Sequence, residues 1–237
     1  MMTNDFSFMT AKQRDRMSAP ARWLHGAGLL RGRVLDLGCG YGRDTEDLRQ
    51  LGVDIVGYDP HYRPERPVGL FDTVICIYVL NVLLPHEQSG VLMDVSQWLR
   101  PGGRAYYAVR RDLTQEGFRL HAIGRQYTYQ CNVRLPYPSL LANRSFELYE
   151  YQPTALGEGR ELVCETCAAI AWRHIGDTHV TVAPRRTVAT EHDLTDREVL
   201  AMRLVTGRVA RDVFGGRCHT AMNIAPDSPP AIIITRE

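Results

Sequence analysis

The sequence has no long hydrophobic run and no excess of charge of one sign. None of its segments approaches the roughly 18 consecutive apolar residues of a membrane-spanning helix, so we expect no association with membranes. Lys and Arg number 28 and Asp and Glu number 27, and this balance excludes a global field that would attract nucleic acid. The charge balance does not exclude a local basic patch. With 44% hydrophobic and 23% charged residues over 237 positions, the composition is that of a globular protein.

Export signals and disulfide scaffolds are missing as well. The first residues, MMTNDFSFMTAKQRDR, lack the basic-then-apolar order of a secretory signal, so we expect a cytoplasmic protein. A chain of this length buries a core without disulfide staples, and we expect reduced thiols. The sequence also lacks internal repeats and low-complexity tracts. The cysteines are Cys39, Cys76, Cys131, Cys164, Cys167 and Cys218.

Strand-like segments alternate with helix-like segments in the first half of the chain. A glycine-rich break after 33–37 is followed by acidic residues at 44–47, which suit the positive N-terminus of a helix. Segment 71–80 is nearly all apolar, as expected of a strand buried on both faces. The alternation predicts an α/β fold with a doubly wound, mostly parallel sheet. Strands are predicted at 33–37, 54–58, 71–80 and 105–109, and helices within 10–30 and at 86–99.

The pattern changes beyond residue 111. Strand-like pieces at 127–133 and 146–151 predict an antiparallel hairpin. The Gly-rich, charged segment 156–161 is typical of a linker, so we predict two domains, 1–155 and 156–237. The second is expected to be a small α+β domain. Its predicted strands are 162–172 (one strand or two), 179–183, 219–224 and 231–235. Its predicted helix, 196–214, begins at a capping box of Thr195 and Glu198.

The chemistry concentrates in the segment DLGCGYG, residues 36–42. Glycines at the end of a strand and before a helix let the backbone turn sharply and let a ligand approach closely. Asp59 ends the next predicted strand about 20 residues later, where an acid in nucleotide-binding α/β folds accepts hydrogen bonds from ribose hydroxyls. These two separated features agree on a nucleoside ligand.

The charge beside the loop favours a cationic nucleoside. Dinucleotide sites favour the spacing G-x-G-x-x-G, whereas the spacing here is G-x-G-x-G with Asp36 just before it. A carboxylate there would repel a phosphate and attract a ligand with an ammonium and a sulfonium beside a ribose. S-adenosylmethionine is such a ligand.

The segments RVLDLGCGYG, GVDIVGYD and LRPGGRAYYAV together resemble the class I S-adenosylmethionine-dependent methyltransferases over residues 33–151. The resemblance implies that the glycine loop lies under the methionine part, that Asp36 lies near its amino group and that Asp59 binds the ribose. Tyr78 would lie near the transferred methyl group, and Cys39 would be a small side chain filling the loop. The implied cofactor-binding residues are Asp36, Gly38, Cys39, Gly40, Gly42, Asp59, Pro60 and Tyr78.

A narrower resemblance covers the N-terminal half. The segments LDLGCGYGRD, GYDP and YVLNVL, with residues at 10–30, are similar to methyltransferase-like proteins associated with DNA phosphorothioation gene clusters. This resemblance implies that Arg14, Arg22, Tyr78 and Asn81 share a pocket, with the two arginines binding substrate and the other two residues in catalytic roles. The alternative is that the arginines lie on a solvated helix face.

The sequence departs from the family pattern at two places, one that concerns the residues contacting adenine and one that concerns the kind of methyl acceptor. Most class I enzymes have an acid after a third strand that contacts adenine, and segment 60–70 leaves hardly any room for such a strand. A backbone contact or the Tyr62 ring would take its place. The segment IYVLNV, 77–82, lacks the Asn or Asp with two prolines that amino-methylating enzymes present, so direct methylation of a DNA base amine is disfavoured.

The expected activity is methyl transfer from S-adenosylmethionine to a small-molecule or nucleic-acid-linked acceptor. The main tasks of such an enzyme are to align an O, N or S nucleophile with the methyl group and to exclude water. No metal is expected. Tyr78, His86 and His121 are candidate general bases, although His86 also fits a helix start. The first alternative is a cofactor-binding sensor or accessory subunit that has lost transfer chemistry, and the second is a nucleotide-binding protein that uses the C-terminal module.

The C-terminal segment faintly resembles histidine-triad nucleotide hydrolases and transferases. Thr187 stands where that family has a histidine after a basic pair, so the nucleophile for nucleotidyl chemistry is missing. We expect a degenerate binding or dimerising module, with a homodimer as one outcome. Arg185 and Arg186 are candidate anion contacts, or part of a solvated turn.

The two cysteines in CETC, 164–167, have zinc-like spacing. Strand positions three apart face opposite sides, however, so we expect thiols in apolar surroundings rather than metal ligands.

Overall fold

The computed structural model describes residues 4–123, 125–223 and 229–237. The chain divides into two compact units. The first comprises Met1–Gln88 and Trp98–Gln152, and the second comprises Ser89–Gln97 and Pro153–Glu237. The predicted first domain, 1–155, includes 89–97, whereas the structure groups this segment with the second unit, because its Met93 packs into that unit's core.

The first unit is built on a six-stranded sheet in the order β2-β1-β3-β4-β8-β7. Strands β1 to β4 run parallel to one another, and β8 and β7 are antiparallel additions at one edge. This confirms the α/β class. The strands are β1 (Val34–Leu37), β2 (Ile55–Tyr58), β3 (Phe71–Ile77), β4 (Leu99–Arg110), β7 (Ser139–Ala142) and β8 (Phe146–Tyr151).

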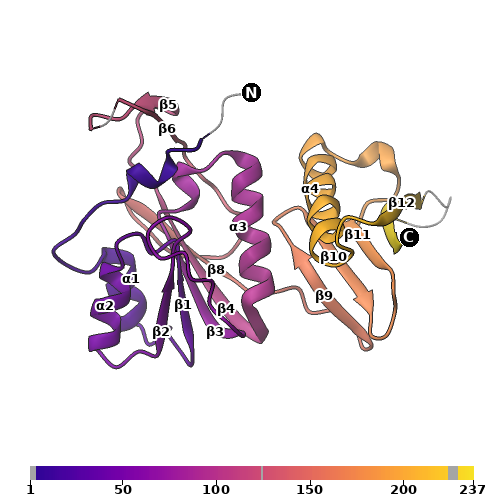
Figure 1. The fold of residues 1–237 in the computed structure, drawn as a ribbon, viewed down its shortest axis with the longest axis horizontal. Coiled ribbons are helices and arrows are strands. Elements are labelled where there is room, and N and C mark those ends of the chain that lie inside the picture. The colour runs from indigo at the N-terminus through magenta and orange to yellow at the C-terminus, as the bar shows by residue number, and fades with distance from the viewer. Residues whose placement is uncertain (1–3, 124, 224–228) are drawn as a thin grey trace. The chain divides into compact units, whose positions relative to one another are not determined.

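Helices connect the parallel strands. The helix α1 (Ala19–Gly26) is capped by Ser18, whose hydroxyl accepts a hydrogen bond from the Ala21 amide. It is followed by α2 (Arg43–Gln50) after β1 and by α3 (Pro85–Trp98) between β3 and β4. Figure 1 shows α1 and α2 together on one side of the sheet, and apolar side chains of both helices share a core with β1 and β3. Two short 3-10 turns, η1 (Ser7–Thr10) and η2 (Leu80–Val82), lie before α1 and after β3.

The predicted hairpin between 127–133 and 146–151 is wrong. The strand β6 (Tyr127–Gln130) pairs with β5 (Gly117–Leu120), and β8 pairs with β4 and β7. Phe146, Leu148 and Tyr151 are buried, so β8 extends the main sheet, whose core offers them cover. Strands β5 and β7 have four residues each, and none of these residues is fully buried, so neither strand has the apolar signal that sequence patterns detect.

The second unit is a five-stranded antiparallel sheet in the order β12-β13-β11-β10-β9, packed against α4 (Asp196–Asp212). The predicted capping box is confirmed, because the Thr195 hydroxyl accepts from the Glu198 amide and the Glu198 carboxylate accepts from the Thr195 amide. Met93, from the α3 segment of this unit, lies in the same core as Val205 and Val209. The strands are β9 (Arg160–Glu165), β10 (Ala169–His174), β11 (Val180–Pro184), β12 (Cys218–Asn223) and β13 (Ala231–Arg236).

Within the described ranges, every helix is too short or too polar to cross a bilayer.

Candidate functional site

The glycine loop between β1 and α2 has three residues in the left-handed region of backbone space. Gly38, Gly40 and Gly42 have φ of 75°, 54° and 85°. A Cβ on Gly38 would overlap the Val79 side chain, and a Cβ on Gly42 would overlap the Arg63 guanidinium. At Gly40 a Cβ would meet only the Cβ of Ala11, at 3.4 Å. The loop is therefore tight at both ends, and its middle is the part that a ligand can approach.

Asp36 is the penultimate residue of the buried strand β1, just before this loop. Its residue is only 3% exposed, and one carboxylate oxygen accepts a hydrogen bond of 2.7 Å from the Thr45 hydroxyl. Burial, and then the neighbouring Asp44 carboxylate, raise the pKa of Asp36 to about 7. A cation placed beside Asp36 would offset both effects, so the group is suited to receive an ammonium.

Asp59 closes the loop from the end of β2. Its Oδ2 accepts a hydrogen bond of 3.0 Å from the Gly40 amide. Its Oδ1 accepts from the amides of His61 and Tyr62, at 2.9 and 3.0 Å. The predicted pair of loop and acid is thus brought together, and Pro60 lies exposed in the turn beside them. A carboxylate oxygen has more than one acceptor position, so these bonds leave room for a ribose hydroxyl.

Asp44 attaches the segment before α1 to the loop. Its Oδ1 accepts a hydrogen bond of 2.6 Å from the Ser18 amide, and its Oδ2 lies 3.3 Å from Nη1 of Arg14. The Arg14 guanidinium lies 5.6 Å from the centre of the Tyr78 ring. The structure therefore brings Arg14 and Tyr78 together, whereas Arg22 is exposed on α1. Asp44 is a site residue that the sequence analysis used only as a helix-terminal charge.

Tyr78 follows β3 in a conformation that is rare for a bulky side chain, with φ of 62°. Its amide donates to the Ala108 carbonyl at 2.8 Å, and its ring meets Phe146 edge-on. Burial raises the pKa of Tyr78, against the opposing effect of Arg14. The phenol therefore keeps its proton at neutral pH and can donate a hydrogen bond. Backbone strain of this kind tends to occur at functional sites.

Asn81, the other predicted catalytic residue, is fully buried in η2. Its Oδ1 accepts from the Arg110 amide at 2.7 Å, and its Nδ2 donates to the Cys131 carbonyl at 2.8 Å. Both ends of the amide are thus used to attach η2 to the end of β4 and to the segment after β6. This bonding suits a positioning residue that holds the backbone near Tyr78.

The remaining predicted residues differ in their surroundings. Cys39 is half-buried, and burial, with Asp36 and Asp59 nearby, raises the pKa of its thiol to about 12. It is consequently an unreactive thiol, as a small loop filler should be. His86 is exposed in the first turn of α3, and the ring of His121 bonds the Ile123 carbonyl at the end of the β5–β6 hairpin.

An aromatic group beside the loop contains Tyr62, the predicted adenine contact, together with Phe8, His61 and Tyr41, which the sequence patterns did not single out. Phe8, in η1, stacks on His61 with ring centres 3.7 Å apart. The Tyr62 hydroxyl donates to the Phe8 carbonyl at 3.1 Å, and the Tyr62 ring lies 4.3 Å from that of Tyr41. The segment that contains η1 thus packs on the turn after β2. The only local signal was the pair of phenylalanines at 6 and 8, which no periodic pattern distinguishes.

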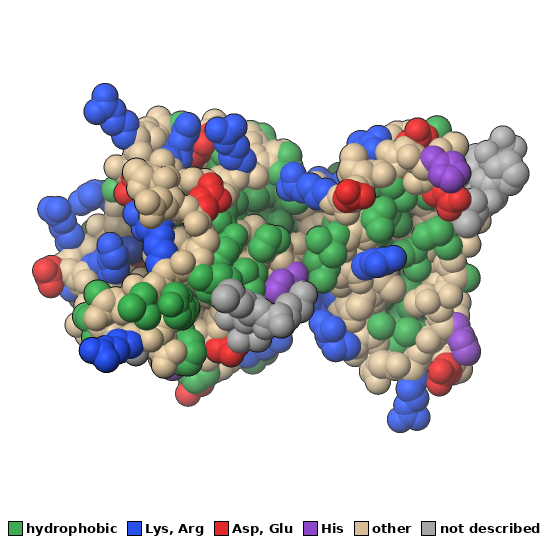
Figure 2. Space-filling model, turned by 90° about the horizontal axis from the view of Figure 1, so that it is seen from above, with side chains coloured by type: hydrophobic (Ala, Val, Ile, Leu, Met, Phe, Trp, Pro, Cys, Tyr) green, Lys and Arg blue, Asp and Glu red, His purple; other side chains and the backbone are tan. Residues whose placement is uncertain are grey.

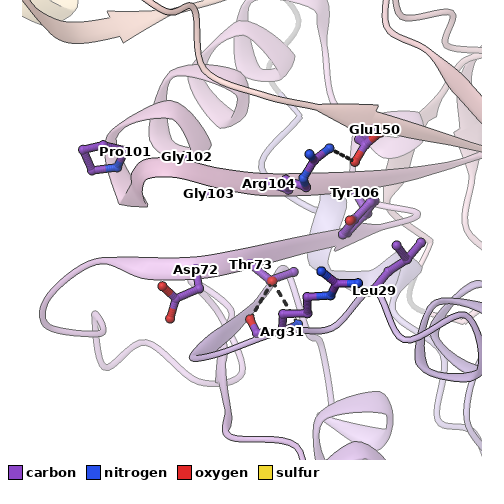
Figure 3. A pocket seen from close by; sticks show the side chains of 10 residues that line it. All are labelled: Leu29, Arg31, Asp72, Thr73, Pro101, Gly102, Gly103, Arg104, Tyr106 and Glu150. Carbon is purple, nitrogen blue, oxygen red and sulfur yellow. Dashed lines mark hydrogen bonds and ion pairs between the residues drawn. The ribbon is translucent and has the colours of Figure 1, made fainter.

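A cavity of about 460 Å³ lies at the opposite end of the strands. Figure 3 shows its wall, formed where β3 and β4 begin, with the ion pair of Arg104 and Glu150 on one side. Thr73 bonds the backbone of Arg31 across it. The cavity is therefore separate from the glycine loop, which follows the carboxyl end of β1.

In the second unit, the predicted anion contacts are held by the protein itself. Arg186 lies 2.5 Å from a Glu198 carboxylate oxygen and donates to the Asp193 carbonyl, and Arg185 lies 3.5 Å from Glu165. Over the described part of the chain, no cluster of three His, Cys, Asp or Glu side chains is placed to bind a metal ion.

Residues 10–157 match a family model described as a methyltransferase domain. No curated protein matches the chain. Among solved structures, a Burkholderia thailandensis 1,6-didemethyltoxoflavin-N1-methyltransferase with bound S-adenosylhomocysteine is 22% identical, with a TM-score of 0.43 over 58% of this chain and 78% of that one. A Synechocystis magnesium protoporphyrin IX methyltransferase is 20% identical, with a TM-score of 0.35 over 56% and 75%. A hypothetical protein from Leishmania major is 19% identical, with a TM-score of 0.29 over 32% of this chain, and the match spans 63% of that protein.

Proposed function

The chain belongs to the methyltransferase domain family, and on that premise we propose that it binds S-adenosylmethionine and transfers the methyl group to a small-molecule or nucleic-acid-linked acceptor. The observation that carries this proposal is the loop of three left-handed glycines between buried Asp36 and the turn at Asp59. It combines a backbone that a ligand can approach with the Asp36 carboxylate, which forms no ion pair with the described residues.

The residues present fit this cofactor. Asp36 would attract the ammonium end, since its carboxylate is buried and, among the described residues, only the Thr45 side chain donates a hydrogen bond to it. Gly40 would lie under the ligand, because the space above it is limited only by Ala11. Asp59, already fixed to Gly40, would accept from the ribose, with Pro60 beside it. Tyr62 and Tyr41 would cover the adenine in place of the missing acid.

The bound cofactor supplies a methyl group already activated by its positive sulfur. What the chain adds is orientation and exclusion of water. Tyr78 would present a protonated phenol beside the acceptor, with Arg14 holding the face of its ring. Asn81 would keep η2, and with it the Tyr78 backbone, at a fixed distance from β4. Arg22 would contact only an acceptor large enough to extend along α1.

Calorimetry with S-adenosylmethionine and S-adenosylhomocysteine tests cofactor binding, and an Asp59→Ala variant tests the site. We expect the variant to bind at least about tenfold more weakly, since it loses the contact that shapes the loop. Transfer of a tritiated methyl group into a metabolite or nucleic-acid extract then identifies the acceptor. Cofactor binding without methyl transfer to any extract would contradict the proposed enzymatic activity. Equal cofactor affinity of the wild type and Asp59→Ala would contradict the assignment of Asp59 to the cofactor site.

A further inference from the structure

Arg119, in β5, is a half-buried residue whose charged side chain has no partner among the described residues. Its Nε and Nη2 atoms are buried and form no hydrogen bond within the described residues. Buried guanidinium nitrogens are almost always paired, because an unpaired one loses its hydration and gains nothing in return. Such a residue indicates that an anion from outside the chain completes the site.

The hairpin that contains Arg119 is fastened to the loop that follows Tyr78. Arg119 lies directly opposite Thr128 in β6, and Thr128 is only 2% exposed, so this face of the hairpin is turned towards the protein. The β6 strand contacts η1 and η2. Asn4 bridges them, since its Oδ1 accepts from the Tyr129 amide and its Nδ2 donates to the Val82 carbonyl.

The acidic side chains around the hairpin are already engaged. Glu116 accepts a hydrogen bond of 2.9 Å from Asn132. Glu87 accepts from Asn4 and from the Leu84 amide. Asp112 is paired with Arg110 at 2.8 Å. None of these three carboxylates neutralises Arg119, so its charge is left for a ligand.

The same end of the unit carries further positive charge. Figure 2 looks down on the end that carries the hairpin and η1, and it shows Lys and Arg side chains spread over that face of the first unit. Arg14 lies beside Tyr78 with only one carboxylate partner, Asp44, among the described residues. An anion that approaches Tyr78 therefore meets favourable charge on the way.

We propose that Arg119 binds an oxyanion group of the methyl acceptor, a carboxylate or a phosphate. This inference rests on the proposed methyl transfer and narrows its acceptor to anionic molecules. A guanidinium is well suited to both groups, because its parallel N–H donors match two oxygens at once. The acceptor would be held by its anion at Arg119 while its nucleophile lies near Tyr78.

The first test is independent of methyl transfer. The melting temperatures of the wild type, Arg119→Gln and a matched control, Arg125→Gln, are measured with inorganic phosphate, with succinate and with sodium chloride at equal ionic strength. Arg125 is exposed in the same hairpin, so Arg125→Gln also removes one positive charge, but at a position that faces solvent. We expect phosphate or succinate to stabilise the wild type and the control but not Arg119→Gln. The preferred anion distinguishes phosphate from carboxylate.

A further variant, Arg119→Met, shows what the unpaired guanidinium costs. Without added anion it is expected to melt no lower than the wild type, because it removes a charged group whose Nε and Nη2 atoms are buried without a hydrogen bond to any described residue. A wild type that neither phosphate nor succinate stabilises beyond chloride would overturn the proposal. An equal gain in Arg119→Gln would overturn it as well.

The second test uses methyl transfer into an extract. Labelled product made by the wild type should be retained on an anion exchanger, and Arg119→Gln should yield about tenfold less of it than Arg125→Gln. Labelled product that passes through the exchanger, or equal yields, would overturn the inference while leaving the methyltransferase intact. An anion effect on melting with no cofactor binding would instead contradict the proposed function alone.

Discussion

At the scale of single residues, Asp36 is held in a state that suits binding more than stability. Its pKa, raised to about 7, means that the ligand-free folded chain binds a proton that the unfolded chain has released above about 4. Stability therefore falls as pH rises from about 4 to 7, by ~1.4 kcal/mol for each unit of pKa shift. The cost is present in full above pH 7.

Asp36→Asn should remove this cost together with the charge that attracts the cofactor. Its melting temperature relative to the wild type should be higher at pH 8 than at pH 5, measured by scanning calorimetry. Wild-type affinity for S-adenosylmethionine should rise as pH passes through 7, because a cation binds the ionised carboxylate. The variant should bind weakly at every pH. Equal affinities at pH 6 and pH 8 in the wild type would argue against direct contact between Asp36 and the cofactor.

Alanine substitutions at Gly38 and Gly52 distinguish the cost of steric overlap from the cost of backbone strain. Both have a positive φ, of 75° and 85°, but a Cβ on Gly38 would overlap Val79, whereas one on Gly52 would meet nothing within 4 Å. Gly52→Ala should cost about 1 kcal/mol of unfolding free energy from strain alone. Gly38→Ala should cost more and should abolish cofactor binding. Denaturant unfolding and calorimetry measure the two effects, and equal losses in both variants would contradict the tight-loop geometry.

At the scale of elements, patterns along the chain predicted those segments that are buried and regular. The helix start at Thr195 and the parallel strands β1 to β4 follow from local rules, because their signals lie within a few residues of each other. Strand β6 lies within the predicted strand 127–133, but β5 and β7 escaped prediction because each has four residues without a clear alternation of buried and exposed positions. Which strand β8 would pair with was decided by the burial that β4 offers, and no local pattern contains that information.

The cap of α4 gives a prediction at this scale. Thr195→Ala removes a hydroxyl that accepts from the Glu198 amide and should lower the unfolding free energy by about 1 kcal/mol. Thr206→Ala is the control, because its hydroxyl bonds the Met202 carbonyl within the same helix and should change stability by less than about 0.5 kcal/mol. Urea titrations compare them. A larger loss at Thr206 would mean that the cap is not what stabilises this helix.

At the scale of the whole molecule, part of α3 belongs to the core of the second unit. Met93 is 4% exposed within that core, and Arg208 of α4 lies 2.6 Å from Asp94. The Ser96 hydroxyl accepts from the Glu165 amide at 3.0 Å. The crossover helix between β3 and β4 is therefore a shared element.

A chain that ends at Gln152 should accordingly be less stable than the full chain. Its α3 would expose Met93 and leave Ser96 and Asp94 without these partners, so its melting temperature should fall and its helix content should drop. Circular dichroism measures both. A Met93→Gln substitution should recover part of the loss in the shortened chain and destabilise the full chain. An unchanged melting temperature on truncation would show that α3 needs no cover from the second unit.

The sequence alone determined the position of the glycine loop, the acids at 36 and 59 and the order of strand and helix, because each depends on residues close together in the chain. The tertiary structure decided which side chains meet from distant segments. Arg14 reaches Tyr78, η1 packs on the turn after β2, and Asn81 holds backbone segments together. Two guanidinium nitrogens of Arg119 are buried without a hydrogen bond to any described residue. These outcomes depend on how irregular segments cross the end of the sheet, and hydrophobic periodicity does not specify such crossings.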